Sequence, residues 1–513
     1  MSFKTNYKRP EWTAALAAMI CGCVTHLFGL ATVLHNNDDI GQQPYGYGTG
    51  ITSGRWLLSV LGDIVGENGG NYNLPFVNGL IYLGLLALCA GLLVSTLHIK
   101  NRKLAALVGL LFVTFPSAAA TMFFRYTVVY YGIAMFLAIF AVWILERHRF
   151  GLLFSVLCIA CSLGIYQAYI PTTIGLFVLL LLKHTLENQT NVWGLVRKGL
   201  YDCVVLILGL LTYYLLLNLF LVLYGTELSN YNGVNNMGNL AFSDIPGLIK
   251  EAVYAFGTLP LKNYCGLANM KWIRICYILL AAVSLALLAY VLFVRIKKLS
   301  LIFFAGLLCC LFPIAVNFVV IMCPDGFIYT IMQYAFVLIG CVPVIILECL
   351  PIGNEQFDKG KALLEKAIAV ILSVLVFCYA YDTNVNYMSC YYADRQTENY
   401  LNALIIQVRM TEGFDTEKEW AFIGNIEDPL FRNPWQYEIR IGGNEAAYSL
   451  VNRDTRYFWI QNYFGYTIPV ASDEKIAQLS INEEVKSMPC WPNDGSIKII
   501  NDTIVIKCQD WQQ

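Results

Sequence analysis

Two adjacent carboxylates, Asp38 and Asp39, are the first residues in the chain whose types and spacing suggest chemistry. Neighbouring acids repel each other when both are charged, which favours proton uptake by one of them. Such a carboxylate can act as a general base on a sugar hydroxyl, and the pair could also supply oxygen ligands to a divalent cation. The simpler alternative is that one Asp caps a short helix.

A second pair, Arg55-Trp56, follows in the same polar segment. The planar guanidinium of Arg matches the oxygens of a phosphate, and Trp is enriched at membrane interfaces. Arg125, the one basic residue in a turn of apolar and small residues, has the same potential role. These residue types favour a lipid-phosphate substrate. The alternative is that Arg55 only extends toward water and that Trp56 belongs to an aromatic belt.

Further polar and aromatic residues lie next to the ends of apolar segments, where polar groups usually face a bundle interior. The candidates for a donor or acceptor pocket at this level are Asn37, Trp56, Tyr126, Tyr166, Gln167, Gln333 and Tyr334. For most of the tyrosines, membership of the interfacial aromatic belt is the simpler interpretation. The sequence has no zinc-ligand spacing, Walker A sequence or Gly-x-Ser-x-Gly elbow.

The composition indicates that a membrane protein carries these residues. The 513 residues are 58% hydrophobic and 13% charged, with a mean hydropathy of +0.57, whereas an ordinary soluble domain carries about 25% charge. So few charges cannot cover a soluble enzyme of this length, and an aromatic content of 14% excludes a disordered chain. A net charge of −1 provides no field that would attract nucleic acid.

Apolar runs long enough to cross a bilayer, about 20 residues each, predict an α-helical polytopic bundle of about eleven transmembrane helices. Nine runs qualify directly, at 12–34, 75–97, 104–122, 126–145, 199–224, 272–293, 299–322, 327–349 and 363–381. The stretch 151–182 is too long for one span and is interrupted at 166–171. It predicts two short helices that meet at an outer turn.

The distribution of Lys and Arg predicts the orientation of this bundle. With a cytoplasmic N-terminus, the inner segments hold 17 of these residues and the outer loops hold 6. An odd number of spans then puts the C-terminal segment outside, together with the remaining 11. Two outer loops are long, 35–74 and 225–271. We therefore expect a transmembrane domain, 1–381, and an extracytoplasmic domain, 382–513.

The composition changes sharply at residue 382, where long apolar runs stop and acidic residues, Asn, Trp and Pro appear. Helical periodicity at 391–411 and β-rich stretches at 420–424 and 499–507 predict a small α/β domain. Cys490 and Cys508 could form a disulfide there, since the outer compartment permits one. Two buried thiols are the alternative.

Three short motifs resemble, in order and spacing, the bacterial glucosyltransferase II family. They are Asn-x-Asp-Asp at 36–39, Ser-Gly-Arg-Trp at 53–56 and Tyr-Gln-x-Tyr at 166–169. This family includes serotype-converting enzymes that modify O-antigen, and it belongs to the GT-C class of membrane glycosyltransferases. The resemblance covers 10–381 and does not extend to the tail.

The resemblance implies a GT-C fold in the bacterial plasma (inner) membrane, with an active site at the outer face. The donor it implies is a hexose carried on undecaprenyl phosphate, and glucose is the hexose we expect. The acceptor would be a cell-surface glycan such as an O-antigen, a teichoic acid or a capsule repeat.

The catalytic carboxylate of the class maps to Asp38 or Asp39, as the base of an inverting displacement, with Arg55 and Arg125 at the donor phosphate. Some members of the class use a divalent metal such as Mg²⁺ or Mn²⁺ and others use none. Asp38 and Asp39 are the ligands this sequence would offer.

Three other functions stay open. A surface-glycan polymerase or ligase also acts at the outer face, but its catalytic loop usually comes late in the chain. A lipid-linked sugar transporter or flippase would be expected to show polar residues near the bilayer midplane and internal repeats. A receptor would not need eleven spans to anchor one small domain. The sequence does not specify an oligomeric state.

Overall fold

A computed structural model of the chain describes residues 9–42, 46–187, 191–229, 243–323, 327–350, 355–426, 440–442 and 450–510. The chain divides into two compact units. The membrane unit comprises Met1–Val33, Pro44–Asn384 and Arg440–Gly443. The C-terminal unit comprises Leu34–Gln43, Val385–Ile439 and Asn444–Gln513. The beginning of the predicted first outer loop thus clusters with residues from the end of the chain.

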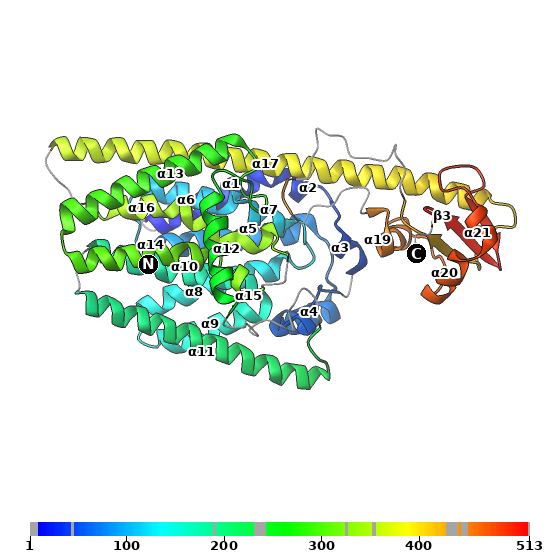
Figure 1. The fold of residues 1–513 in the computed structure, drawn as a ribbon, viewed down its shortest axis with the longest axis horizontal. Helices are drawn as coiled ribbons and strands as arrows, with labels where there is room; N and C mark the ends of the chain where they lie inside the picture. Colours follow the sequence, from blue (N-terminus) through cyan, green and yellow to red (C-terminus); the bar gives the residue numbers. More distant parts are fainter. Residues whose placement is uncertain are drawn as a thin grey trace. The chain divides into compact units, whose positions relative to one another are not determined.

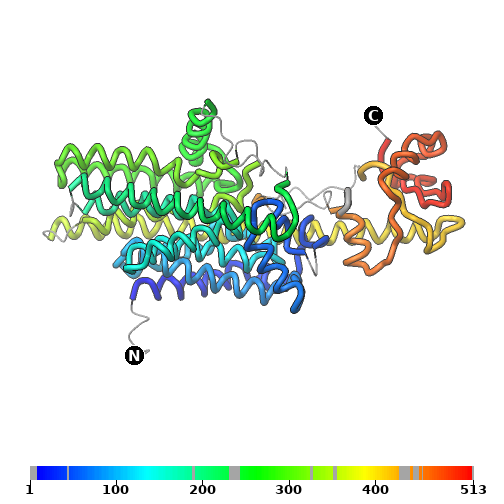
Figure 2. The backbone as a smooth tube through the Cα atoms, turned by 90° about the horizontal axis from the view of Figure 1, so that it is seen from below, coloured from blue at the N-terminus to red at the C-terminus, as the bar shows by residue number. Residues whose placement is uncertain are grey.

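The membrane unit is a bundle of helices that lie alongside one another (Figures 1 and 2). Helix α1 packs on α5 and α6, α8 packs on α5 and α9, and α10 packs on α14. The helices of this unit are α1 (Pro10–Thr25), α2 (Leu27–Ala31), α4 (Trp56–Asn68), α5 (Pro75–Thr96), α6 (Arg102–Thr114), α7 (Pro116–Met122), α8 (Val128–Arg147), α9 (Gly151–Ile165), α10 (Ile170–Glu187), α11 (Val192–Tyr224), α12 (Ile245–Thr258), α13 (Lys271–Ala289), α14 (Leu299–Val316), α15 (Val319–Met322) and α16 (Cys341–Glu348).

Shorter pieces complete the bundle. A π-helical segment, η5 (Tyr290–Ile296), extends α13, and a 3-10 segment, η6 (Thr330–Gly340), precedes α16. Helix α17 (Glu355–Met410) begins in the membrane unit and ends in the C-terminal unit.

Several predicted spans are interrupted. The run 104–122 is divided at Pro116 into α6 and α7, which are bent by 42°, because proline lacks the N–H that would continue the helix. The stretch 151–182 is divided into α9 and α10 by the 3-10 turn η3 (Gln167–Tyr169). This break confirms the predicted pair of helices.

Eight helices within the described ranges are long and apolar enough to cross a membrane, or nine if the bent pair α6–α7 forms one span. The chain is therefore a multi-pass membrane protein. When the bent pair is counted as one span, two of the eleven predicted spans remain unaccounted for, each for a local reason. The run 12–34 is divided at His26, so that α1 has 16 residues, and α9 has only 15. The figure of eleven spans stays a prediction.

The C-terminal unit contains a three-stranded sheet in the order β1-β3-β2. The β-rich stretch at 420–424 is confirmed as β1 (Glu419–Ile423), whereas the stretch at 499–507 is divided by a turn between β2 (Ile497–Ile500) and β3 (Thr503–Lys507). Strands β2 and β3 form an antiparallel hairpin, and β1 pairs with β3 in parallel. The two-residue turn of the hairpin, Asn501-Asp502, has φ of 50° and 59°, as a type I′ turn requires.

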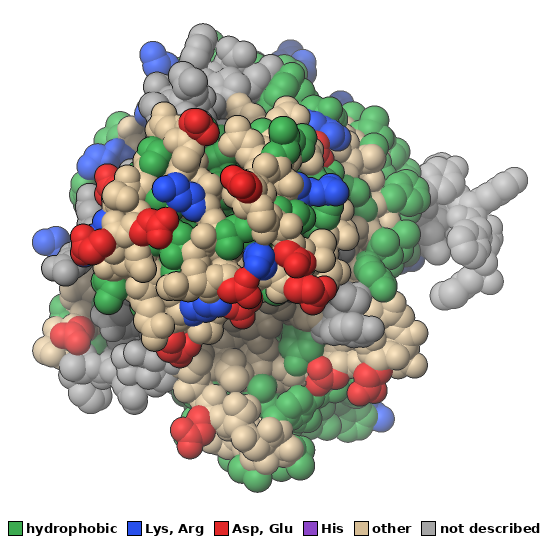
Figure 3. All heavy atoms as spheres, turned by 90° about the vertical axis from the view of Figure 1, so that its right-hand side faces the viewer, with side chains coloured by type: hydrophobic (Ala, Val, Ile, Leu, Met, Phe, Trp, Pro, Cys, Tyr) green, Lys and Arg blue, Asp and Glu red, His purple; other side chains and the backbone are tan. Residues whose placement is uncertain are grey.

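Helices complete this unit. They are α3 (Asn37–Gln42), the last part of α17, α19 (Arg453–Phe458), the π-helical η8 (Trp459–Tyr463), α20 (Asp473–Ser480) and α21 (Glu483–Ser487). Their core includes Leu404, Trp420, Trp459 and Ile504. Cys490 and Cys508 are not joined in a disulfide in the structure. Figure 3 shows acidic, basic and hydrophobic side chains mixed on the face it presents.

Candidate active site

Arg55 is held over an aromatic ring in the membrane unit. It lies directly before α4 and is partly buried. Its Nη1 donates to Thr49 Oγ1 at 3.1 Å and to Tyr131 Oη at 3.3 Å. Its Cζ lies 5.1 Å from the centre of the Tyr166 ring, which stacks on Tyr131 with 4.6 Å between ring centres. These contacts orient a planar guanidinium, the group best suited to bind a phosphate.

Gln167 and Tyr213 hold the backbone that precedes Arg55. Gln167 Nε2 donates to the Ser53 carbonyl at 2.9 Å, and Tyr213 Oη donates to the Gly54 carbonyl at 3.0 Å. Gly54 has a φ of +79°, and a Cβ there would lie 2.7 Å from Tyr213 Oη and 2.8 Å from Gln167 Nε2. Both the backbone angle and the space require glycine, which explains this position of the Ser-Gly-Arg-Trp motif.

Trp56 is buried within the bundle. Its ring stacks on Phe220 of α11, with 5.0 Å between centres and 16° between planes. It also lies against Gly164 of α9, where a Cβ would approach the indole to 2.5 Å. Trp56 thus fastens α4 to two neighbouring helices and so fixes the start of the helix that Arg55 precedes.

Arg125 has different surroundings from Arg55, because it is fully buried. It lies in the turn between α7 and α8. Its Nε donates to the Met122 carbonyl at 3.1 Å, and its Nη1 donates to the Thr32 carbonyl at 2.9 Å. The Arg125 carbonyl accepts a bond from Asn78 Nδ2 at 2.9 Å. These bonds join three segments of the bundle, which favours a structural role for this arginine.

We expect Arg125→Ala to lower the melting temperature of the purified full-length protein. The change removes the donor from two carbonyls, and an unsatisfied buried polar group costs about 1–3 kcal/mol. The exposed Arg149 offers a matched control, and Arg149→Ala should melt like the wild type. An unchanged melting temperature for Arg125→Ala, together with weaker donor binding, would instead support the phosphate-binding role predicted from the sequence.

The other predicted pocket residues of the membrane unit, Tyr126, Gln333 and Tyr334, are also buried. Tyr334 Oη donates to the Phe112 carbonyl at 2.9 Å. Its ring contacts that of Tyr169 at 6.1 Å between centres, and Tyr169 contacts Tyr166 at 4.9 Å. Gln333 Nε2 donates to Tyr264 Oη at 3.4 Å. The structure therefore brings Arg55, Tyr166 and Gln167 together and connects Tyr334 to them through a row of rings.

The two predicted catalytic acids lie in α3 of the C-terminal unit, and their surroundings differ. Asn36 Oδ1 accepts the backbone N–H groups of Asp38, at 2.9 Å, and Asp39, at 3.0 Å. Asp39 Oδ1 in turn accepts the Asn36 N–H at 3.1 Å. This reciprocal capping accounts for Asp39, which is buried, whereas Asp38 is exposed. Asp38 is therefore the better candidate for a base that meets a substrate.

These acids do not form a metal site by themselves. In the part of the chain that the structure describes, no group of three or more His, Cys, Asp or Glu residues could hold a metal ion. Asp39 Oδ1 is already used by the capping bond. Asp38 and Asp39 alone therefore do not supply a complete set of protein ligands, and no catalytic step below is assigned to a metal.

Several polar partners in the membrane unit have no recognisable signal in the sequence. Thr49 lies in a glycine-rich segment and Tyr213 within an apolar run, so nothing local linked either one to Arg55. A second polar group consists of the buried Asp382 and the partly buried Asn269 and Arg440. Asp382 accepts bonds from Asn269 Nδ2 at 2.7 Å and from Arg440 Nη1 at 3.2 Å. Its only local signal is its position directly after the apolar run 363–381.

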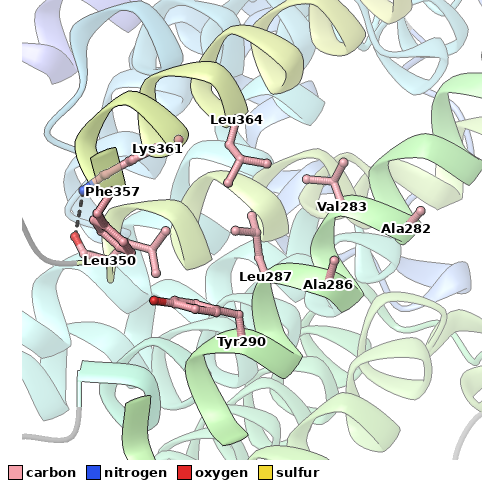
Figure 4. A pocket seen from close by; sticks show the side chains of 10 residues that line it. Ala282, Val283, Ala286, Leu287, Tyr290, Leu350, Phe357, Lys361 and Leu364 are labelled. Carbon is pink, nitrogen blue, oxygen red and sulfur yellow. Dashed lines mark hydrogen bonds between the residues drawn. The ribbon is translucent and has the colours of Figure 1, made fainter. Parts of the chain in front are cut away.

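A cavity of about 670 Å³ lies elsewhere in the membrane unit, between α13 and the first turns of α17 (Figure 4). Its lining is apolar except for Tyr290 and Lys361. Lys361 Nζ donates to the Leu350 carbonyl at 2.7 Å. The lining contains no carboxylate and none of the residues around Arg55, so we do not place the reaction there.

Comparison with known protein families identifies the family of this chain. A family model described as Glucosyl transferase GtrII matches residues 27–340, more than half of the chain. The chain belongs to the glucosyl transferase GtrII family. The matched range includes Asp38, Asp39, Arg55, Arg125 and Gln167, and it confirms the resemblance seen in the short motifs. No curated protein and no solved structure matches the chain significantly. The protein is thus a membrane glycosyltransferase.

Proposed function

We propose that this GtrII-family protein transfers a hexose from a polyprenyl phosphate, such as undecaprenyl phosphate, to a cell-surface glycan. Glucose is the hexose we expect. Family membership supports sugar transfer, and a bundle of apolar helices suits a lipid-borne donor. The observation that carries the donor class is Arg55, a partly buried guanidinium held by Thr49 and Tyr131. Such a planar donor group can bind two oxygens of a phosphate through parallel hydrogen bonds.

The reaction we propose is an inverting single displacement. Asp38 accepts the proton of an acceptor hydroxyl while the hydroxyl oxygen forms a bond to the anomeric carbon of the sugar. The bond between that carbon and the phosphate oxygen breaks, and the polyprenyl phosphate leaves with the electron pair. Arg55 offsets the negative charge that grows on this phosphate. Tyr166 and Gln167 support Arg55 through the ring contact and the bond to Ser53.

The outer face of a bacterial plasma membrane is the location that we propose for this reaction. The support is the distribution of Lys and Arg, with 17 in the predicted inner segments and 6 in the outer loops. This orientation places the N-terminus in the cytoplasm and the segment after residue 382 outside, where a cell-surface glycan is accessible.

A transfer assay with purified full-length protein in lipid nanodiscs tests this proposal. The donors would be a panel of polyprenyl-phosphate hexoses, with an isolated surface glycan as acceptor. We expect transfer from one member of the panel, glucose first, with inversion at the anomeric carbon. Absence of transfer from every donor would contradict the proposed function if another activity appeared instead. Movement of the donor across a vesicle bilayer would then indicate a flippase, and growth of a polymer would indicate a polymerase.

A further inference from the structure

The segment that carries the candidate base is part of the hydrophobic core of the C-terminal unit. Ile40, in the middle of α3, is 3% exposed and belongs to the same cluster as Leu404 and Trp459. Asn462 Nδ2 donates to the Ile40 carbonyl at 2.8 Å. A Cβ at Gly41 would lie 2.7 Å from the Phe458 ring. Segments separated by about four hundred residues in the sequence thus pack together closely within this unit.

A side-chain contact holds the residue next to Asp38. Thr455 of α19 donates from Oγ1 to Asn37 Oδ1 at 3.2 Å, and Thr455 is buried. Asn37 is the first residue of α3, so this bond acts at the end of the helix where Asp38 lies. The contacts of Thr455 and Asn462 fix the two ends of the four-residue stretch from Asn37 to Ile40.

The chain just before α3 is held by Asp394 of α17. The His35 backbone N–H donates to Asp394 Oδ2 at 3.2 Å, and His35 Nδ1 lies 3.2 Å from the same oxygen. Cys390 Sγ donates to the His35 carbonyl at 3.3 Å. Asp394 lies beyond the apolar run 363–381, and burial raises the pKa of its carboxyl while the bonds from His35 oppose that rise. The His35 ring also packs edge-on against Trp459, with 5.0 Å between ring centres.

We propose that Thr455, Asn462 and Asp394 are positioning residues for Asp38, so that the C-terminal unit holds the catalytic segment in its working conformation. This inference rests on the proposed function in one respect, the role of Asp38 as base. A helix of six residues is not stable by itself, and its direction must come from tertiary contacts. A base misplaced by about 1 Å can lose about 10²-fold in rate.

Hydrogen–deuterium exchange of the full-length protein tests whether these contacts hold the segment. Thr455→Val keeps the shape of the side chain and removes the donor to Asn37, and Asn462→Ala removes the donor to Ile40. We expect both changes to speed exchange in the peptide covering 34–42, and Thr455→Ser to restore protection. Thr397→Val is the matched control, because this buried hydroxyl donates within its own helix, to the Ala393 carbonyl at 2.8 Å.

Kinetic measurements on the same samples test the catalytic consequence. We expect Thr455→Val and Asn462→Ala to lower kcat by at least about tenfold with an unchanged KM for the donor, since neither residue belongs to the group around Arg55. Thr455→Ser should recover kcat, and Thr397→Val should keep it.

The two readouts separate this inference from the proposed function. Unchanged exchange at 34–42 in both variants would overturn it, and so would faster exchange with a wild-type kcat. If the wild-type protein transfers no sugar, the proposed function fails alone, and the exchange data still decide whether the C-terminal unit holds α3.

Discussion

Replacing Asp38 by Asn should remove most of the sugar transfer and leave the fold intact. The amide has the size of the carboxylate but cannot take the proton of an acceptor hydroxyl, and losing a general base costs about 10²–10⁴-fold in rate. Because the Asp38 side chain is exposed, little packing is lost. The measurement is kcat with polyprenyl-phosphate glucose, together with the melting temperature of the same sample.

Asp39→Asn is the informative comparison for this prediction. Its amide oxygen can still accept the Asn36 N–H, now 3.1 Å from Asp39 Oδ1, so we expect most of the activity to persist. Asp473→Asn serves as a control, because Asp473 is an exposed acid in the first turn of another helix of the same unit. If Asp39→Asn were inactive and Asp38→Asn active, the base would be Asp39 and the proposed role of Asp38 would be wrong.

Replacing Arg55 by Ala should have the second large effect, on both donor binding and turnover. We expect a raised KM for the donor and a kcat lower by about 10²–10³-fold, the usual effect of removing one group that stabilises developing charge. Arg55→Lys should be intermediate, because it keeps the charge but loses the planar fork that contacts Thr49 and Tyr131. Steady-state kinetics over a range of donor concentrations provides both constants.

Arg149→Ala is the matched control for Arg55, because Arg149 also stacks on an aromatic ring. Its Cζ lies 4.6 Å from the centre of the Phe150 ring, in the exposed turn between α8 and α9. We expect this variant to behave like the wild type. Wild-type kcat and KM for Arg55→Ala would show that the donor phosphate binds elsewhere.

Most of the helices and strands could be predicted from the sequence, because an apolar run or an alternating pattern is a property of one segment. The break at 166–169 and the strand at 420–424 are examples. The span count was harder to predict, because tertiary contacts interrupt apolar runs. The helix in 12–34 stops at Thr25, and His26 Nε2 then lies 3.1 Å from the Val113 carbonyl, a partner that hydropathy does not indicate.

The sequence by itself determined that this is a membrane protein, and its short motifs indicated a glycosyltransferase family. Only the tertiary structure distinguished Asp38 from Asp39 and Arg55 from Arg125. The members of each pair have the same chemistry. Asp39 and Arg125 are buried against backbone groups, whereas Asp38 and Arg55 keep some exposure to solvent. The role of a charged side chain depends on which groups satisfy it and on how much water they exclude. Asp39 is satisfied by the nearby Asn36, and Arg125 by the nearby Met122 and the distant Thr32. The burial that separates them from Asp38 and Arg55 arises only on folding, so local sequence does not specify it.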